Sequence, residues 1–264
     1  MDEFKLQKII NGSGFPLQIG IASVINNTKH KHGWNVLFQE HSWINNNTDA
    51  GGFIDLILED KSERIILNVE CKRVKDSSWL FLNPSNKIEN RFHIKAFYTH
   101  AELGGLKEFG WSDITAEPGT PESEFCVFGG QDGASRSMLE KLAANVVEST
   151  EGFAIEDHSY SHEISVFKRF YINVIVTTAK LLVCSFEPDS IDISSGEVDL
   201  KGSVEVPFLR FRKQLSVYSM PELSWMKTDA RGISRAKEST VFVVNSNHII
   251  DFLENLEINE QYIT

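Results

Sequence analysis

The stretch GGFIDLILEDKSERIILNVECKR, residues 51–73, decides the fold of this chain, because its two aliphatic halves are separated by a polar turn. Apolar runs of this length around such a turn are typical of two paired antiparallel strands. Each strand nevertheless carries charged residues where apolar side chains would cost less free energy to bury. These residues are Asp55 in the first strand and Glu70 with Lys72 in the second.

The turn predicts how the two strands pair. If Leu58 pairs with Ile65, Asp55 lies opposite Asn68 and diagonal to Glu70. Diagonal neighbours on one face of a sheet are roughly 7–8 Å apart. We therefore expect the two carboxylates to be close enough to bind one ion between them.

Two carboxylates in one place repel each other and lose hydration, so the arrangement is unfavourable unless a cation or a proton offsets it. Mg²⁺ prefers oxygen ligands and commonly takes one or two carboxylates, which leaves positions for water and phosphate oxygens. Lys72 shares a strand face with Glu70 and would place an ammonium group beside such an ion. It could there act on an attacking water or stabilise charge on a phosphate. In the structural alternative, Asp55 is a strand-edge residue, and Glu70 and Lys72 form an exposed cross-strand ion pair worth under about 1 kcal/mol.

The surrounding sequence predicts alternating helices and strands. Helices are expected at 16–30, 134–149 and 247–258, strands at 34–44 and 239–245, and a bent pair of buried strands at 170–186. Residues 104–134 are rich in Gly, Pro and acidic residues, which predicts a loop-rich insertion, with a short apolar interruption, FCVFGG, that could be a strand. No repeat or linker is evident, so residues 1–264 are expected to form a single α/β domain around a mixed central sheet.

The composition limits the class of protein. The chain has 264 residues, of which 41% are hydrophobic and 24% charged, which is typical of a soluble globular protein. No apolar run approaches the roughly 20 residues that span a bilayer, and the start MDEFKLQKII does not resemble a signal peptide. A cytoplasmic location is therefore expected. The three cysteines are widely spaced, which favours neither a disulfide framework nor a zinc ribbon.

The charge distribution restricts where nucleic acid could bind. A net charge of −11 argues against a generally basic surface. Residues 1–80 hold 9 Lys and Arg against 10 Asp and Glu, so any surface that faces nucleic acid should include this first third. Arg210, Arg212 and Lys213 form a second cationic group. They could contact phosphates, or they could be the solvated charges of an edge strand.

Asp55 followed by Glu70-Cys71-Lys72 resembles the PD-(D/E)xK signature of the restriction-endonuclease-like nuclease superfamily. Ile54 stands where the signature has proline, which is a common variation. The string LNVECKRVKDSSWLFL and the earlier FPLQIGIAS are similar to bacterial members of the superfamily, and the resemblance is specific over residues 15–82. It implies a core of one helix, three strands, a second helix and a fourth strand in a mixed sheet, with further strands and helices added.

The resemblance also implies a site. Asp55, Glu70 and the backbone carbonyl of Cys71 would bind Mg²⁺, for which Mn²⁺ can substitute, and Lys72 would serve the attacking water. The superfamily often adds a residue from the first helix or strand, and here Gln18 and Glu40 are the two candidates.

Residues that follow the site directly are expected to position a nucleic-acid strand. They are Arg73, Lys75 and Trp79. The side chain of Trp79 could equally pack in the core.

The leading hypothesis is therefore a Mg²⁺-dependent nuclease that hydrolyses phosphodiester bonds. The expected substrate is DNA rather than RNA, and the expected role is one such as restriction or phage defence. The alternative is a catalytically silent module with the same fold that binds nucleic acid or a protein. A small-molecule hydrolase or a structural domain would instead keep the three polar residues apart. A lone nuclease domain also suggests a homodimer or a partner subunit.

Overall fold

The computed structural model describes residues 2–45, 49–75, 77–85, 87–102, 105–128, 138–160, 167–215 and 234–259. Its α-helices are α1 (Glu3–Gly12), α2 (Phe15–His32), α3 (Met138–Tyr160) and α5 (Ile249–Asn255), with short 3-10 turns η1 (Pro188–Ser190) and η2 (Ser246–His248). Its strands are β1 (Asn35–Asn45), β2 (Ala50–Glu59), β3 (Ile65–Lys72), β4 (Ser78–Asn83), β5 (Arg91–Glu102), β6 (Gly105–Thr120), β7 (Glu122–Ser123), β8 (Phe125–Phe128), β9 (Phe167–Thr177), β10 (Lys180–Ser185), β11 (Gly202–Glu205), β12 (Phe208–Gln214), β13 (Glu238–Asn245) and β14 (Glu257–Ile258).

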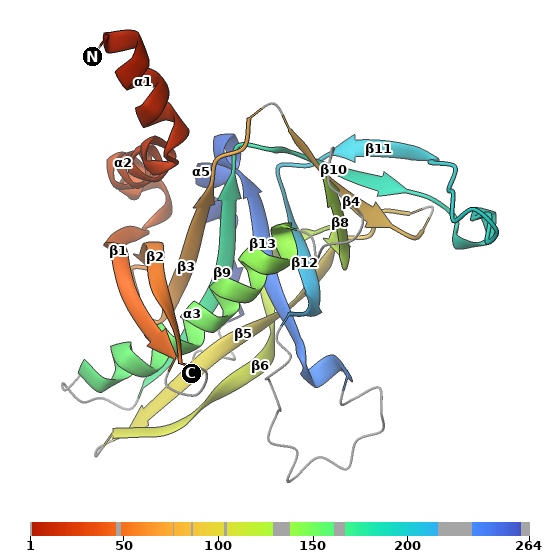
Figure 1. Cartoon of the computed structure of the whole chain (residues 1–264). Helices are drawn as coiled ribbons and strands as arrows, with labels where there is room; N and C mark the ends of the chain where they lie inside the picture. The colour runs from red at the N-terminus through yellow and green to blue at the C-terminus, as the bar shows by residue number, and fades with distance from the viewer. Residues whose placement is uncertain are drawn as a thin grey trace.

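A ten-stranded mixed sheet forms the centre of this α/β protein (Figure 1). Its main path runs β1-β2-β3-β9-β13-β12-β7, and β5, β6 and β14 join beside it. The first three strands form an antiparallel meander, whereas β3, β9 and β13 are parallel. Along its other edge, β9 pairs first with β5 and then with β13.

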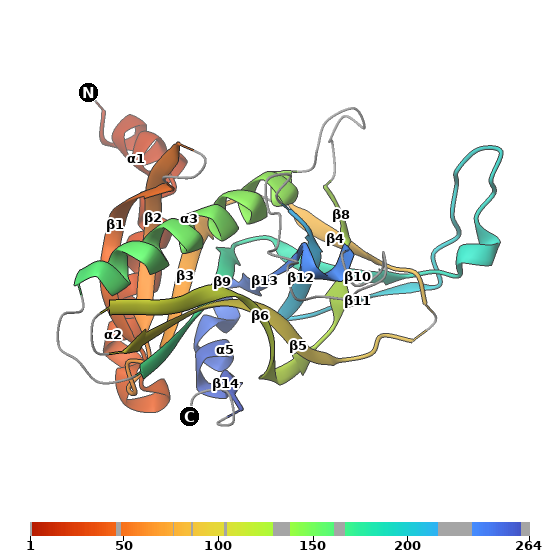
Figure 2. The same cartoon turned by 90° about the horizontal axis from the view of Figure 1, so that it is seen from below.

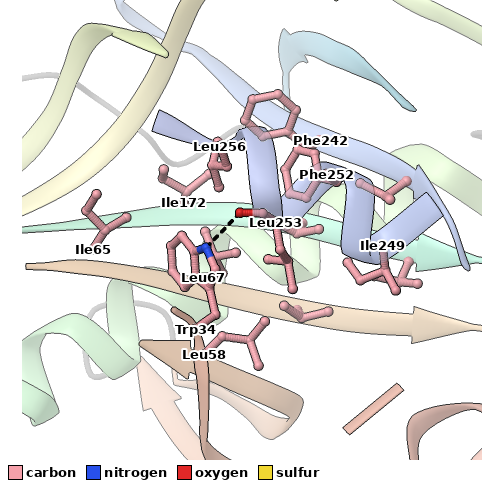
Figure 3. Packing of buried hydrophobic residues seen from close by; sticks show 14 of the residues in the cluster. Trp34, Leu58, Ile65, Leu67, Ile172, Phe242, Ile249, Phe252, Leu253 and Leu256 are labelled. Atoms are coloured by element: carbon pink, nitrogen blue, oxygen red, sulfur yellow. Dashed lines mark hydrogen bonds between the residues drawn. The ribbon is translucent and has the colours of Figure 1, made fainter. Parts of the chain in front are cut away.

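Helices cover both faces of this sheet. In Figure 2, α3 lies across one face, and α2 and α5 lie on the other. On the side of α2 and α5, the indole Nε1 of Trp34 donates a hydrogen bond of 3.1 Å to the backbone oxygen of Leu253, beside Leu58 and Phe252 (Figure 3). Burial of these aliphatic and aromatic side chains supplies most of the driving force that holds the layers together.

A second, four-stranded sheet has the order β11-β10-β4-β8. In this sheet β4 pairs parallel with β10. Along the chain β4 follows β3 and β10 follows β9, and β3 and β9 are themselves parallel neighbours in the large sheet. The two sheets share a buried cluster that includes Trp79 and Leu181 from the small sheet, Val241 from the large sheet and Leu139 from α3.

The predicted helices at 16–30, 134–149 and 247–258 correspond to α2, α3 and α5, although α3 begins at Met138 and continues to Tyr160. The bent pair of strands at 170–186 is confirmed as β9 and β10, which enter different sheets. The helix α1 was not predicted. No helix in the described ranges is long and apolar enough to cross a membrane.

The prediction of a loop-rich insertion at 104–134 is wrong for residues 105–123, which form β6 and β7, whereas the FCVFGG segment that could be a strand contains β8 (Phe125–Phe128). Residues 129–134 lie outside the described part. β6 pairs with β5 along most of its length, and this pairing satisfies the backbone polar groups. Strand formation here therefore depends on a cross-strand partner, which outweighs the weak local preference of a Gly- and acid-rich segment.

Candidate functional site

The register between β2 and β3 brings the two carboxylates of interest together. Leu58 pairs with Leu67, two residues beyond the predicted partner Ile65. Continued one residue past the pair Leu56–Val69, this register places Asp55 directly opposite Glu70, closer than the predicted diagonal. A shift of two residues leaves every side chain on its predicted face, because the side-chain period of a strand is two.

The turn between β2 and β3 explains the shift. The Asp60 carboxylate accepts hydrogen bonds from the backbone N–H groups of Ser62, Arg64 and Ile65, at 2.8–3.0 Å. The backbone N–H of Asp60 also donates to the oxygen of Ile65. An aspartate that bonds to backbone groups just after it is a common way to close a turn. The last pair is Glu59 with Ile66, so the six-residue loop is 60–65 and not the predicted 59–64, and this displacement by one residue on each strand shifts the register by two.

Two hydrogen bonds hold Asp55 in place. Its Oδ2 accepts from the backbone N–H of Cys71, on the neighbouring strand, at 2.7 Å. Its backbone oxygen accepts from Nε2 of Gln18, in the first turns of α2, at 2.9 Å. Gln18 is buried and therefore positions the strand that carries Asp55.

Electrostatic coupling shows that the acidic side chains share one environment. Burial raises the pKa of Glu70 to about 7, and the charge of Asp55 adds to the rise, whereas Lys72 opposes it. Burial also raises the pKa of Asp55, although the Cys71 N–H and Lys72 act in the opposite direction. Burial raises the pKa of the Cys71 thiol as well, which keeps its sulfur neutral and leaves the backbone as the polar part of this residue.

Glu40 on β1 completes a row of acidic residues across three strands. Its neighbours Gln39 and His41 pair with Leu56 and Ile54, so the register places Glu40 opposite Asp55. Its φ of 53° lies in the left-handed region, which is unusual for a non-glycine residue inside a strand. Such a conformation costs on the order of 1–3 kcal/mol and is typical of functional sites. The exposed Glu40 carboxylate raises the pKa of Asp55 and of Glu70.

The donor set suits a hard divalent ion. Asp55 and Glu70 offer carboxylate oxygens from opposed positions, and Mg²⁺ is commonly held by one or two carboxylates together with waters. Among the described residues, no group of three or more His, Cys, Asp or Glu side chains is arranged to hold a metal. Any ion would therefore rest on two carboxylates, backbone oxygen and water.

The ammonium group of Lys72 is available at this site. Within the described ranges it makes no hydrogen bond or ion pair, yet its charge lowers the pKa of both Asp55 and Glu70. The chain just beyond it is fixed by Thr178, whose hydroxyl donates to the Val74 oxygen at 2.8 Å and accepts from the Val74 N–H at 2.9 Å. This role of Thr178 was missed, because only the parallel pairing of β3 with β9 brings it near.

The three residues predicted to position nucleic acid lie in different environments. Arg73 and Lys75 are exposed, and Nη1 of Arg73 donates to the backbone oxygen of Asn11 at the end of α1. Trp79 is 0% exposed and packs edge-on against Phe128 in the core between the sheets. The prediction that Trp79 contacts nucleic acid is therefore wrong, because alternation along β4 turns its ring inward.

Arg210 is neither an exposed phosphate contact nor a solvated charge on an edge strand, which are the two alternatives that the sequence left open. β12 pairs with both β13 and β7, so it is not an edge strand. Arg210 is 0% exposed, and its guanidinium donates to the backbone oxygens of Ala116 and Pro118 and to the Thr120 hydroxyl, at 2.6–3.0 Å. It is a structural residue that sequence periodicity alone could not place.

Comparison with known proteins found no matching family model, no matching curated protein and no matching solved structure. The geometry of the site is therefore the basis for a function.

Proposed function

We propose that this protein is a Mg²⁺-dependent nuclease whose centre is the row formed by Asp55, Glu70 and Lys72. The observation that carries the proposal is the opposition of Asp55 and Glu70 on adjacent strands, with Lys72 beside them and free of other partners in the described ranges. Burial raises the pKa of both carboxylates, and the charge of Asp55 raises that of Glu70 further, so a divalent cation held between them would offset this electrostatic cost.

We also propose that α2, β1, β2, β3, α3 and β9 form a restriction-endonuclease-like core. Their order along the chain, one helix, three antiparallel strands, a helix and a parallel strand, supports this assignment. The resemblance of residues 15–82 to the superfamily supports it independently, since it rests on residue identity and not on pairing.

Each residue has a defined role in this proposal. Asp55, Glu70 and the carbonyl of Cys71 would hold Mg²⁺, or Mn²⁺ in its place. A bound ion supplies Lewis-acid stabilisation of the phosphate and lowers the pKa of a bound water. Lys72 orients the attacking water or stabilises the charge that builds on the phosphate. Gln18 acts by holding the backbone of Asp55.

DNA is the proposed substrate, and restriction or phage defence in the cytoplasm is the proposed role. Arg73 and Lys75 follow the site directly and are exposed, so they can contact phosphates there. Lysine and arginine contacts to phosphates give an affinity that falls as salt concentration rises.

The test is cleavage of supercoiled plasmid, linear duplex and single-stranded DNA and RNA with Mg²⁺, Mn²⁺ or EDTA. The native chain is compared with Asp55→Asn, Glu70→Gln and Lys72→Ala. Glu205→Gln, an exposed acidic residue on β11, is the matched control. We expect metal-dependent cutting that the three site variants lose and the control keeps.

Calorimetric titration with Mn²⁺ separates binding from chemistry. The proposal predicts that Asp55→Asn and Glu70→Gln weaken Mn²⁺ binding, whereas Lys72→Ala keeps it and loses cleavage. If neither Asp55→Asn nor Glu70→Gln changes Mn²⁺ binding, the proposed metal site is wrong.

A catalytically silent module with the same fold is the second candidate. The absence, among the described residues, of a third metal-ligating side chain beside the two carboxylates favours it. Under this hypothesis the native chain binds DNA without cutting it in any metal, and Arg73→Ala weakens that binding while Asp55→Asn does not.

A further inference from the structure

The chain passes from the large sheet into the small sheet at two neighbouring points, and one of them lies directly after Lys72. Lys72 ends β3 and pairs with Thr177, which ends β9, and the strands that follow these two, β4 and β10, pair in the small sheet (Figure 1). The backbone pairing of the large sheet therefore stops beside the residue on which the proposed chemistry depends. Backbone polar groups beyond this point need other partners.

Thr178 supplies partners for the chain after Lys72. Its backbone N–H donates to the Lys72 oxygen at 3.3 Å. Its hydroxyl donates to the Val74 oxygen at 2.8 Å and accepts from the Val74 N–H at 2.9 Å. One side chain thus binds both backbone polar groups of Val74, which a neighbouring strand does elsewhere in a sheet. Residues 72–74 are in this way tied to the end of β9.

The corner that carries Thr178 is itself fixed. Asn245, at the end of β13, donates from Nδ2 to the Ala179 oxygen at 2.8 Å, and the Ala179 N–H donates to the Thr177 hydroxyl at 3.1 Å. Thr177 and Ala179 are both 0% exposed. A side chain whose neighbours on both sides are held can fix the position of a third group.

The ammonium group of Lys72 depends on this backbone for its position. Within the described ranges it has no hydrogen bond or ion pair of its own, and the lysine stem is flexible. Asp55 is different, because the Cys71 N–H and Gln18 hold it directly. A change at residues 72–74 should therefore move the ammonium group and leave the carboxylate in place.

We propose that Thr178 is a positioning residue of the nuclease centre. Its hydroxyl holds residues 72–74 against β9 and so directs the Lys72 ammonium group toward Asp55 and Glu70. This proposal rests on the proposed function, because it assigns Thr178 a role in the chemistry that Lys72 would perform.

A substitution that removes only the hydroxyl isolates this role. Thr178 is exposed, so water can bind the Val74 backbone groups in its place and the fold loses little stability. Such a water is not attached to β9 and cannot hold the segment. Thr178→Val keeps the β-branched shape, whereas Thr178→Ser keeps the hydroxyl.

Steady-state cleavage of a DNA duplex with Mg²⁺ is the first measurement. We expect Thr178→Val to lower kcat roughly tenfold, since small displacements of a catalytic group have effects of this size, with KM, Mn²⁺ affinity and melting temperature unchanged. Thr178→Ser should restore the native kcat. Thr28→Val, which removes a hydroxyl bonded to the Val24 oxygen at 2.7 Å in α2, is the matched control. A native kcat in Thr178→Val, or an equal loss in Thr178→Ser, would overturn the proposal.

Crystal structures of the native chain and of both Thr178 variants keep the two proposals separate. In Thr178→Val we expect the Lys72 Nζ atom to move by about 1 Å or more, while the carboxylates of Asp55 and Glu70 keep their places, and in Thr178→Ser we expect no movement. Lys72 in its native position in Thr178→Val rejects the positioning role, whether or not the chain cuts DNA. A native chain that cuts nothing, with Lys72 displaced as expected in Thr178→Val, rejects the nuclease and supports Thr178 as the residue that positions Lys72.

Discussion

At the scale of single residues, Glu70 is held in a state that the folded chain disfavours. Its pKa rises from an ordinary value of 4.5 to about 7, first because the carboxylate is buried and second because Asp55 lies nearby. The burial follows from its place on β3, a strand between β2 and β9 that is otherwise buried along most of its length. Ionised Glu70 therefore destabilises the metal-free protein.

This destabilisation predicts a pH dependence of folding. The folded pKa lies above the unfolded one, so the penalty is absent below about pH 4.5, grows with pH, and is complete above about pH 7. Its full size is about 3 kcal/mol. In EDTA, we expect Glu70→Gln to be more stable than the native chain at pH 8 by about 1–3 kcal/mol and close to it at pH 4.5. Urea denaturation measures both, and an equal difference at the two pH values would contradict the assignment.

Arg210 is the opposite case, a buried charge whose two terminal nitrogens have acceptors, although its Nε has no hydrogen-bond partner among the described residues. Its guanidinium donates to three acceptors on β6, and it lies 4.8 Å from the Phe242 ring centroid. Burial lowers its pKa to about 10, so it stays protonated at neutral pH. The side chain joins β12 to β6.

Removing Arg210 should therefore destabilise the protein strongly. We expect Arg210→Ala to lower the free energy of unfolding by about 3–5 kcal/mol, because the carbonyl oxygens lose their donor. Arg210→Lys should recover only part of this, since lysine lacks the planar fork. Arg91→Ala, at an exposed ion pair with Glu89, is the control and should cost under about 1 kcal/mol. Chemical denaturation measures the free energy of unfolding of all three variants.

At the scale of elements, α3 is fastened to the sheet beside the candidate site by a buried polar network. Asn68 donates to the hydroxyls of Ser149 and Thr150, at 2.9 and 2.7 Å. Thr150 in turn donates to Asn173 at 2.8 Å. Asn68 lies two residues before Glu70, so this network fixes the face of β3 from which Glu70 projects.

Close backbone packing of α3 against β1 makes a second test of this layer. A Cβ on Gly152 would lie 2.8 Å from the Ile44 backbone oxygen and 3.1 Å from the Trp43 ring. We expect Gly152→Ala to destabilise by about 1–3 kcal/mol through overpacking. Gly20→Ala in α2, where nothing lies within 4 Å, should stabilise by about 0.5–1 kcal/mol. Thermal melting measures both variants. A shift of the two melting temperatures in the same direction would contradict this packing.

At the scale of the whole molecule, one projecting loop carries a large share of the net negative charge. The loop of residues 187–200 between β10 and β11 projects from the body in both views (Figures 1 and 2) and holds five acidic residues with no Lys or Arg. Its removal would change the net charge from −11 to −6. Long-range repulsion of a polyanion scales with this charge and is screened by salt.

Replacing residues 187–200 with a short Gly-containing turn therefore tests the proposed substrate. The hairpin already pairs Ser185 with Gly202, so a short turn can close it. We expect little change in the melting temperature and tighter DNA binding at low salt, with the difference fading at high salt. Fluorescence anisotropy with a labelled duplex measures this, and unchanged binding at low salt would count against a nucleic-acid substrate.

The sequence by itself determined the local elements whose signals are strong. Pro16 and the apolar spacing after it marked α2, β-branched runs marked β9, β10 and β13, and alternation placed Glu70 and Lys72 on one face of β3. These features depend on near neighbours in the chain, so they can be read without the fold.

Only the tertiary structure decided which distant residues meet. The loop closed by Asp60 moved Asp55 from diagonal to opposite Glu70, and the pairing of β5 turned a Gly-rich segment into β6. The burial of Trp79 arose from packing between the two sheets, the burial of Arg210 from its contacts with β6, and the contact of Thr178 with the chain after Lys72 from the parallel pairing of β3 with β9. Such contacts depend on register and layer packing, which join residues far apart in sequence and leave no local periodic signal.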